Sequence, residues 1–206
     1  MPPQFLFFDL GNVLLKFDHH LAARQMAEVA GISESRAWDV VFASDLEARY
    51  ERGQINDREF YEVFCRQTDS RADYDRLLLA SSEIFTPNAS IFPVVAALDA
   101  AGHRLGILSN TSPAHWAYCI DGRYGLLNLA FDVAALSFEI GACKPDPQIY
   151  LAAAKMAGVS CEQIFFVDDI AANVAGARAA GFDAVQYTDT PALVADLRKR
   201  AIEFNY

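Results

Sequence analysis

Short apolar runs that stop at polar side chains recur along this chain, and helical patterns lie between them. The first run, 4–8, stops at Asp9, and a later run, 164–167, stops at Asp168 and Asp169. Continuous apolar runs of this length are typical of strands that are buried on both faces of a parallel sheet. Because such runs alternate with helical patterns, the sequence predicts an α/β fold with a doubly wound, Rossmann-like parallel sheet.

The part of the chain after residue 90 supplies most of the expected elements. We expect further strands at 104–109, 133–136 and 184–187, and helices at 92–101, 148–157, 171–180 and 191–202. Pro93 and Pro147 favour helix starts, because proline fits the first turn of a helix. Ligands bind beyond the carboxyl ends of the strands in such sheets, so polar residues that directly follow strands are the candidate functional residues.

Residues 19–80 have a different pattern. Apolar side chains recur there at spacings of three to five, with polar breaks near Gly31, Gly53 and Asp69. This spacing predicts four or five short helices. We therefore expect a helical domain at 16–88 that is inserted into a core formed by 1–15 and 89–206.

Composition excludes several classes of protein. The chain has 206 residues, 53% of them apolar and 21% charged, which is typical of a folded protein that needs no disulfide or metal to stabilise it. The 17 basic and 27 acidic residues give a net charge of −10, and the basic ones are scattered, so we expect no nucleic-acid partner. No apolar run approaches the ~20 residues of a membrane span, so we expect no membrane partner.

Cysteine usage and the first residues predict the compartment. The four cysteines have no C-x-x-C spacing, and the first ten residues lack the basic start of a signal peptide. We therefore expect reduced thiols in a cytoplasmic protein. As a separate expectation, the protein is a monomer or a weak homodimer.

Four groups of polar residues follow expected strands, and each is ambiguous when taken alone. Asp9 can be a nucleophile or a metal ligand, although Asp-x-Gly-Asn is also a common turn. Ser109 and Asn110 can bind phosphate oxygens or cap a turn. Lys144, which precedes Pro145, can meet a bound anion or lie in solvent.

The adjacent pair Asp168 and Asp169 carries the strongest signal. Two like charges ~4 Å apart repel by about 4 kcal/mol at an effective permittivity of ~20, so the pair favours a bound cation. Carboxylates combined with water and substrate oxygens are the ligands that Mg²⁺ prefers.

Taken together and in this order, the four groups resemble the motifs of the haloacid dehalogenase-like hydrolase superfamily. The resemblance covers the whole chain, and the helical insertion is similar to the small helical cap of that superfamily. The segments FDLGNV, YERGQIND, SNT, CKPDPQIY and VDDIAANVAGA look most like the branch that includes α-D-glucose-1-phosphate phosphatases.

The resemblance implies a Mg²⁺-dependent phosphatase that acts on a small phosphorylated metabolite, such as a sugar 1-phosphate, through an aspartyl-phosphate intermediate. It implies that Asp9 is the nucleophile and that Lys144 neutralises both the nucleophile and the phosphate. It further implies that Ser109 and Asn110 bind phosphoryl oxygens and that Asn173 orients the acidic cluster. The implied metal ligands are Asp9, the Gly11 carbonyl, Asp169 and Asp168.

One position departs from the pattern of many relatives. They carry a second aspartate two residues after the nucleophile, as a general acid and base, and this chain has Gly11 there. We expect rates that depend steeply on leaving-group basicity, unless a residue of the insertion such as His19 or His20 supplies the proton. Arg52 is the expected polar contact to substrate, with a surface salt bridge as the alternative.

Two other functions remain open from the sequence. A 2-haloacid dehalogenase would use the same aspartate without a metal, and the pair Asp168 and Asp169 argues against it. A phosphate-binding protein that has lost turnover is the other alternative, because of Gly11.

Overall fold

The computed structural model describes residues 2–206 and, apart from positions 128 and 129, their side chains. Residue 1, the first of the expected core, lies outside the described residues. Five parallel strands form one sheet in the order β5–β4–β1–β6–β7. They are β1 (Phe5–Phe8), β4 (Leu105–Ser109), β5 (Val133–Leu136), β6 (Ile164–Asp168) and β7 (Asp183–Gln186). The predicted fold class is confirmed.

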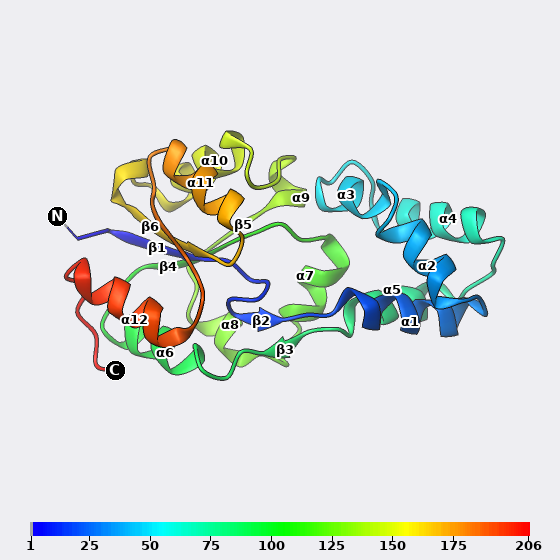
Figure 1. The fold of residues 1–206 in the computed structure, drawn as a ribbon, viewed down its shortest axis with the longest axis horizontal. Coiled ribbons are helices and arrows are strands. Elements are labelled where there is room, and N and C mark those ends of the chain that lie inside the picture. Colours follow the sequence, from blue (N-terminus) through cyan, green and yellow to red (C-terminus); the bar gives the residue numbers. More distant parts are fainter. Residues whose placement is uncertain (1) are drawn as a thin grey trace.

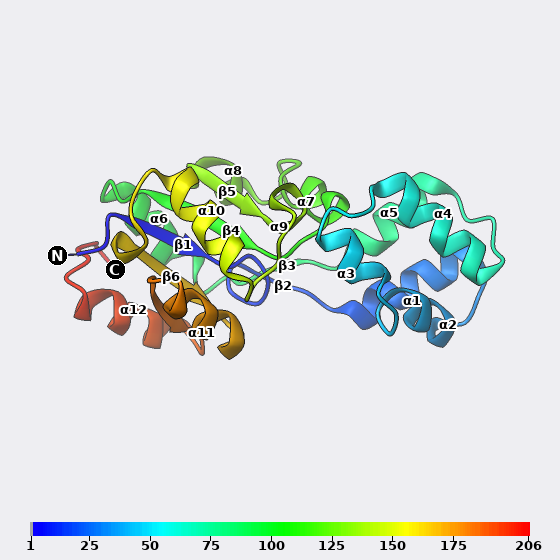
Figure 2. The same cartoon turned by 90° about the horizontal axis from the view of Figure 1, so that it is seen from above.

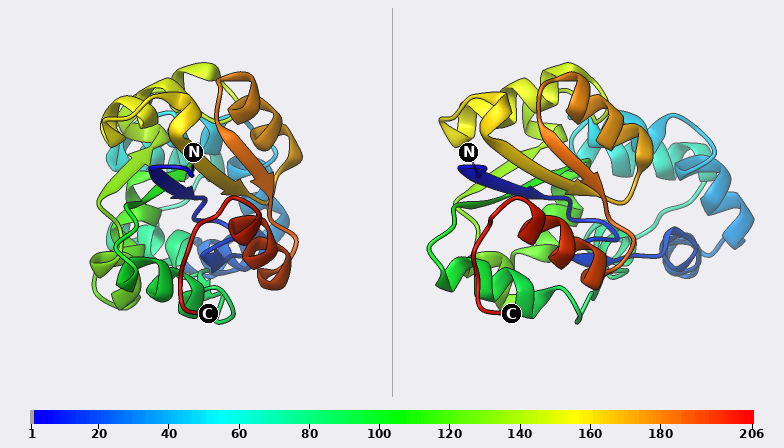
Figure 3. Two further views of the ribbon diagram at one scale, coloured as in Figure 1. Left: turned by 90° about the vertical axis from the view of Figure 1, so that its left-hand side faces the viewer. Right: turned by 60° about the vertical axis from the view of Figure 1, so that its left-hand side comes forward.

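Helices cover both faces of this sheet (Figures 1 and 3). One face carries α6 (Phe92–Ala100), α8 (Gly125–Leu129) and α12 (Thr190–Lys199), and the other carries α10 (Pro147–Ala157) and α11 (Ala171–Ala179). Within β1, Phe5 and Phe7 belong to the core on the α10 and α11 side, whereas Leu6 and Phe8 belong to the opposite core. Burial on both faces explains why the run is apolar throughout.

The segment 16–88 leaves and re-enters the sheet region through two short strands. β2 (Leu15–Lys16) pairs antiparallel with β3 (Thr86–Pro87). Between them lie α1 (His19–Ala30), α2 (Glu34–Val41), α3 (Leu46–Glu51), α4 (Asp57–Thr68) and α5 (Tyr74–Ser82). These helices bury a hydrophobic core of their own and lie beyond the carboxyl ends of the sheet strands (Figures 1 and 2).

Several short elements have no counterpart among the expected ones. They are α7 (Pro113–Cys119), α9 (Ser137–Ile140) and a 3₁₀ turn (Cys161–Gln163), together with α8, β2 and β3. Each is too short for an apolar period to show. Two of them have local signals. At α7, Ser112 Oγ accepts a hydrogen bond from the His115 N–H and Pro113 follows, and at the 3₁₀ turn Ser160 and Gln163 form a capping box.

Two expectations from composition can be compared with the described residues. All four cysteines, Cys65, Cys119, Cys143 and Cys161, are free thiols. Among residues 2–206, no helix is both long and apolar enough to cross a membrane.

Candidate active site

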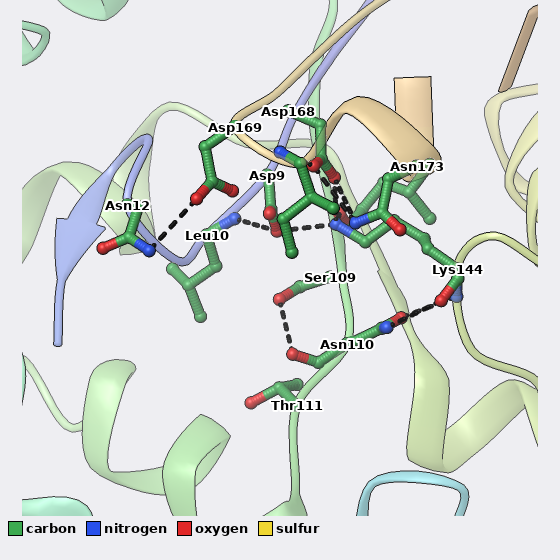
Figure 4. Close-up of polar contacts among 12 residues, drawn as sticks. Asp9, Leu10, Asn12, Ser109, Asn110, Thr111, Lys144, Asp168, Asp169 and Asn173 are labelled. Carbon is green, nitrogen blue, oxygen red and sulfur yellow. Dashed lines mark hydrogen bonds and ion pairs between the residues drawn. The ribbon is translucent and has the colours of Figure 1, made fainter. Parts of the chain in front are cut away.

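The four groups of polar residues meet at the carboxyl edge of the sheet (Figure 4). Asp9 directly follows β1, Ser109 ends β4, and Asp168 ends β6. Since β4 and β6 flank β1, these three side chains project from adjacent strands. Lys144 comes from the loop before α10 and reaches the same point.

The Lys144 ammonium group lies between two carboxylates. Its Nζ is 2.8 Å from Asp9 Oδ1 and 2.6 Å from Asp168 Oδ2, and it donates a third hydrogen bond to the Leu108 carbonyl oxygen at 3.0 Å. The side chain is only 1% exposed. Burial opposes the charged form, but Asp9 and Asp168 outweigh burial and raise the pKa of Lys144. The lysine is therefore a fixed, buried cation.

The protonation state of the Asp9 carboxyl group depends on burial and on the charges of its neighbours. Its Oδ1 accepts a hydrogen bond from the Leu10 N–H at 2.7 Å. Burial is the main reason that its pKa is raised to about 7; Asp168 and Asp169 add to the effect, whereas Lys144 opposes it. A further cation near Asp9 would favour the ionised form that a nucleophile requires.

Asp168 and Asp169 have different surroundings although they are adjacent. Asp168 is fully buried, and its carboxylate accepts from the Ile170 N–H at 2.8 Å and from Asn173 Nδ2 at 3.1 Å to each oxygen, besides contacting Lys144. Asp169 is partly buried, and its Oδ2 accepts from Asn12 Nδ2 at 3.1 Å. Burial raises the pKa of Asp169. Asp168 therefore has less free capacity for a metal than Asp169 has.

The donor set fits a hard divalent cation. Asp9, Asp168 and Asp169 each offer a carboxylate oxygen, and these oxygens all lie within 4.8 Å of one another. Oxygen donors of this kind suit Mg²⁺, which takes few protein ligands and keeps sites for water and substrate oxygens. Three clustered carboxylates with a single lysine between two of them leave negative charge that such an ion would neutralise.

The side-chain amide of Asn110 is engaged at both ends by the backbone of Lys144. Its Nδ2 donates to the Lys144 carbonyl oxygen at 3.0 Å, and its Oδ1 accepts from the Lys144 N–H at 2.7 Å. Both ends of the amide therefore hold the backbone that carries the lysine. Ser109 Oγ is buried and donates to the Asn110 carbonyl oxygen at 3.2 Å.

A small cavity of about 60 Å³ lies between these residues and the helical segment. The core lines it with Leu10, Gly11, Ser109, Asn110, Thr111 and His115, and the segment 16–88 lines it with Phe17, His19, Glu51 and Phe85. This cavity is where the candidate site and the insertion meet.

The end of α3 is fixed to the core beside this cavity. Ser137 Oγ donates to the Glu51 carbonyl oxygen at 2.6 Å and accepts from the Thr111 N–H at 3.0 Å. Gly53 has a φ of 65°, and a Cβ atom there would lie 2.1 Å from the Phe138 carbonyl oxygen. Only glycine permits this close approach of the two backbones.

The structure separates the remaining expected residues. His19 lines the cavity, whereas His20 is exposed and stacks on Trp38 with 4.2 Å between ring centroids. Arg52 is exposed and does not line the cavity; the cavity residue at this turn is its neighbour Glu51. The sequence indicates a turn at YERG but does not predict which of its side chains lines the cavity, because α3 is less than two turns long and shows no clear apolar period.

Comparisons with known proteins show the family of this chain. The family model described as haloacid dehalogenase-like hydrolase matches residues 4–181. A phosphatase from Mycobacterium tuberculosis (strain CDC 1551 / Oshkosh) is 43% identical over 83 residues, which are 40% of this chain and 38% of the relative. The match therefore spans under two-fifths of the length of that curated relative.

Two solved structures share the fold across nearly the whole chain. A haloacid dehalogenase-like family enzyme from Bacteroides thetaiotaomicron, in complex with magnesium and inorganic phosphate, has a TM-score of 0.80 at 21% identity, covering 93% of this chain and 98% of that one. A haloacid dehalogenase-like family hydrolase from Porphyromonas gingivalis has a TM-score of 0.80 at 25% identity, covering 96% of this chain and 99% of that one.

Proposed function

This chain belongs to the haloacid dehalogenase-like hydrolases, and we propose that it is a Mg²⁺-dependent phosphatase of small phosphate esters that forms an aspartyl-phosphate intermediate. One observation carries the proposal: the candidate nucleophile Asp9 lies 2.8 Å from a buried lysine and within a cluster of three carboxylates. A carboxylate can attack a phosphate dianion only where the repulsion between them is cancelled, and this site offers a cation and a metal donor set together.

In the proposed reaction, an Asp9 carboxylate oxygen attacks phosphorus and the bond to the leaving oxygen breaks. Lys144 stabilises the charge on the carboxylate and the phosphoryl group, and Asp168 with Asn173 keeps the ammonium in position. Ser109 Oγ and the backbone N–H of Asn110 bind phosphoryl oxygens. When bound by Asp9, Asp169 and the Gly11 carbonyl, with Asp168 beside them, Mg²⁺ would supply charge neutralisation and orient the phosphate.

Two related proteins support the phosphatase proposal. The partial relative from M. tuberculosis is named a phosphatase, and the B. thetaiotaomicron enzyme has been crystallised with magnesium and phosphate. The carboxylate cluster favours this reaction over 2-haloacid dehalogenation, which needs no cation.

We extend the proposal to the segment 16–88, as a cap that reads the leaving group, and to sugar phosphates, sugar 1-phosphates in particular, as substrates. The first extension rests on the cavity, whose walls come from both the core and this segment. The second rests on the sequence resemblance. We further propose a cytoplasmic monomer or weak homodimer that binds neither nucleic acid nor membranes, in keeping with a net charge of −10.

A substrate panel tests the proposed function. It contains an aryl phosphate, the 1- and 6-phosphates of several sugars, and 2-chloropropionate, each assayed with Mg²⁺ and with EDTA. The proposal predicts phosphate release that requires Mg²⁺ and no halide release. Halide release that persists in EDTA would instead identify a dehalogenase.

A further inference from the structure

The position two residues after the nucleophile has no side chain that could donate a proton, and a side chain there would require the Phe17 ring to move. Gly11 has no Cβ, and an added Cβ would lie 2.7 Å from a ring carbon of Phe17. The aromatic ring therefore occupies the space into which a side chain at position 11 would project. A side chain that protonates the leaving oxygen must therefore belong to another wall of the cavity.

Three titratable side chains line that cavity: His19, Glu51 and His115. His115 is not available to donate a proton to the leaving oxygen, because its Nε2 lies 3.1 Å from the Ser81 carbonyl oxygen and burial lowers its pKa to about 4. A neutral ring in this position donates its only N–H proton to that carbonyl.

His19 is also held away from proton transfer. Its ring stacks on Phe42 with 4.6 Å between centroids, and its Nε2 lies 3.3 Å from Glu47 Oε1. Burial lowers the pKa of His19 below its usual value. The ring is therefore packed against the helical segment and has one nitrogen already engaged there.

Glu51 differs from both histidines. Within the part of the chain that the structure describes, no hydrogen bond or ion pair reaches its carboxyl group. Its backbone is fixed, because its carbonyl accepts from Ser137 and the next turn packs against Phe138. Glu51 thus lines the same cavity as Ser109 and Asn110, and its carboxyl group lies close enough to Lys144 for that cation to act on its pKa, while its main chain is anchored to the core.

We propose that Glu51 is the general acid and base of the reaction, replacing the group that Gly11 lacks; this inference rests on the proposed phosphatase function. As the bond from phosphorus to the leaving oxygen breaks and the bond to Asp9 forms, protonated Glu51 gives its proton to the leaving oxygen. The resulting Glu51 carboxylate then takes a proton from the water that attacks phosphorylated Asp9. Phosphate leaves, and Asp9 and protonated Glu51 are regenerated.

The surroundings of Glu51 suit both halves of this cycle. Burial raises its pKa to about 7, and Lys144 and Arg52 oppose the effect only in part. A carboxyl group of this kind is protonated in part of the population near neutral pH and can also act as a base. The other titratable groups around it are Glu47 on its own helix, His19 on α1, His115 on α7 and the Cys143 thiol.

The test compares Glu51→Gln with Glu47→Gln, which makes the same change one turn earlier in α3 at a carboxylate that lies against a different cavity. Both proteins and the wild type are assayed with Mg²⁺ on an alkyl phosphate and an aryl phosphate, since the aryl oxygen leaves without help. We also measure the fraction of enzyme trapped as phosphoenzyme by acid during turnover of the aryl ester, and the pH profile of kcat/KM.

We expect Glu51→Gln to lower kcat/KM for the alkyl ester by ~10²-fold or more and for the aryl ester by much less. The phosphoenzyme fraction should rise above that of the wild type, and the fall of kcat/KM above about pH 7 should disappear. Glu47→Gln should retain the wild-type ratio of the two esters and the wild-type phosphoenzyme fraction.

Each other outcome identifies what has failed. If wild type forms phosphoenzyme but Glu51→Gln changes neither the ester ratio nor the trapped fraction, the assignment of Glu51 is wrong and the phosphatase proposal stands. If both variants change these readouts alike, the effect comes from charge in α3, and Glu51 is not the proton donor. If wild type hydrolyses no ester and traps no phosphoryl group, the proposed function itself is wrong.

Discussion

The side-chain amide of Asn110 bridges the backbone of Lys144, donating to its carbonyl oxygen at 3.0 Å and accepting from its N–H at 2.7 Å. This contact joins the residue after β4 to the loop that carries Lys144. The ammonium group of that lysine contacts Asp9 and Asp168 within 2.8 Å. Asn110 therefore acts on the site through the position of Lys144.

Asn110→Ala should consequently lower kcat more than it raises KM. The loop would lose two hydrogen bonds, and misplacement of a catalytic group by about 1 Å can cost ~10²-fold in rate. Steady-state kinetics with an aryl phosphate measure the split between kcat and KM. A rise in KM with unchanged kcat would show that the amide binds substrate directly.

Lys144→Met should abolish turnover and destabilise the fold. Removing one partner of a buried ion pair costs about 3–5 kcal/mol, because the other charges are left unpaired. The pKa of Asp9, already raised to about 7, should rise further without the cation. Between pH 3.8, the ordinary carboxyl pKa, and the raised pKa of Asp9 in the folded variant, the folded protein holds a proton that the unfolded chain has released. The free energy of unfolding of the variant therefore falls as pH rises through this range.

Urea unfolding of wild type and Lys144→Met at about pH 8 and about pH 5.5 measures this effect. We expect the difference in unfolding free energy between the two proteins to shrink at the lower pH. A difference that is the same at both pH values would contradict the ionised state of Asp9 next to Lys144.

Asp169→Asn should remove the response to Mg²⁺. Asp169 is the partly buried member of the cluster, and its only described side-chain partner is Asn12. Isothermal calorimetry and the thermal shift on adding Mg²⁺ report binding without substrate; saturation at 100 times Kd stabilises a protein by about 2.7 kcal/mol. The exposed residue Asp39 provides the control, because Asp39→Asn makes the same change far from the cluster and should leave the Mg²⁺ response intact.

Gly53→Ala should displace the end of α3 from the core. An alanine Cβ there would meet the Phe138 carbonyl oxygen, and the residue also needs a left-handed backbone. Gly31 has nearly the same φ, 68° against 65°, but nothing lies within 4 Å of a Cβ at that position. Gly31→Ala should therefore lower the free energy of unfolding by about 1 kcal/mol, through backbone strain alone, and leave kcat/KM unchanged. Gly53→Ala should in addition reduce kcat/KM. Equal kinetics for the two variants would show that the contact with Phe138 does not matter for turnover.

Much of the site could be predicted from the order of polar residues at strand ends. Asp9, Ser109 and Asp168 meet because parallel strands align their carboxyl ends, and an apolar run followed by a polar residue marks each such end in the sequence. The expectation that Lys144 directly follows a strand is wrong, because α9 lies between it and β5 and the loop before α10 brings it to the site. The helical segment was recognisable by its period, although the short helices α7 and α9 were not.

The remaining features depend on contacts between segments that are distant in the chain. Nothing in the local sequence shows that the Phe17 ring fills the space beside Gly11. Docking of α3 on Ser137 brings Glu51 to the cavity and leaves the expected Arg52 outside it. Asn110 and Lys144 are 34 residues apart, so their hydrogen bonds follow from the fold and not from either motif.

The central claim is that Asp9 carries the phosphoryl group during turnover. The direct measurement is acid quenching of wild type and Asp9→Asn during turnover of an aryl phosphate with Mg²⁺, followed by mass spectrometry of the peptide that contains residue 9. We expect one added phosphoryl group on the wild-type peptide, stable in acid and removed by hydroxylamine, and none on Asp9→Asn, which should also be inactive. Turnover by wild type without this adduct, or turnover by Asp9→Asn at the wild-type rate, would contradict the account.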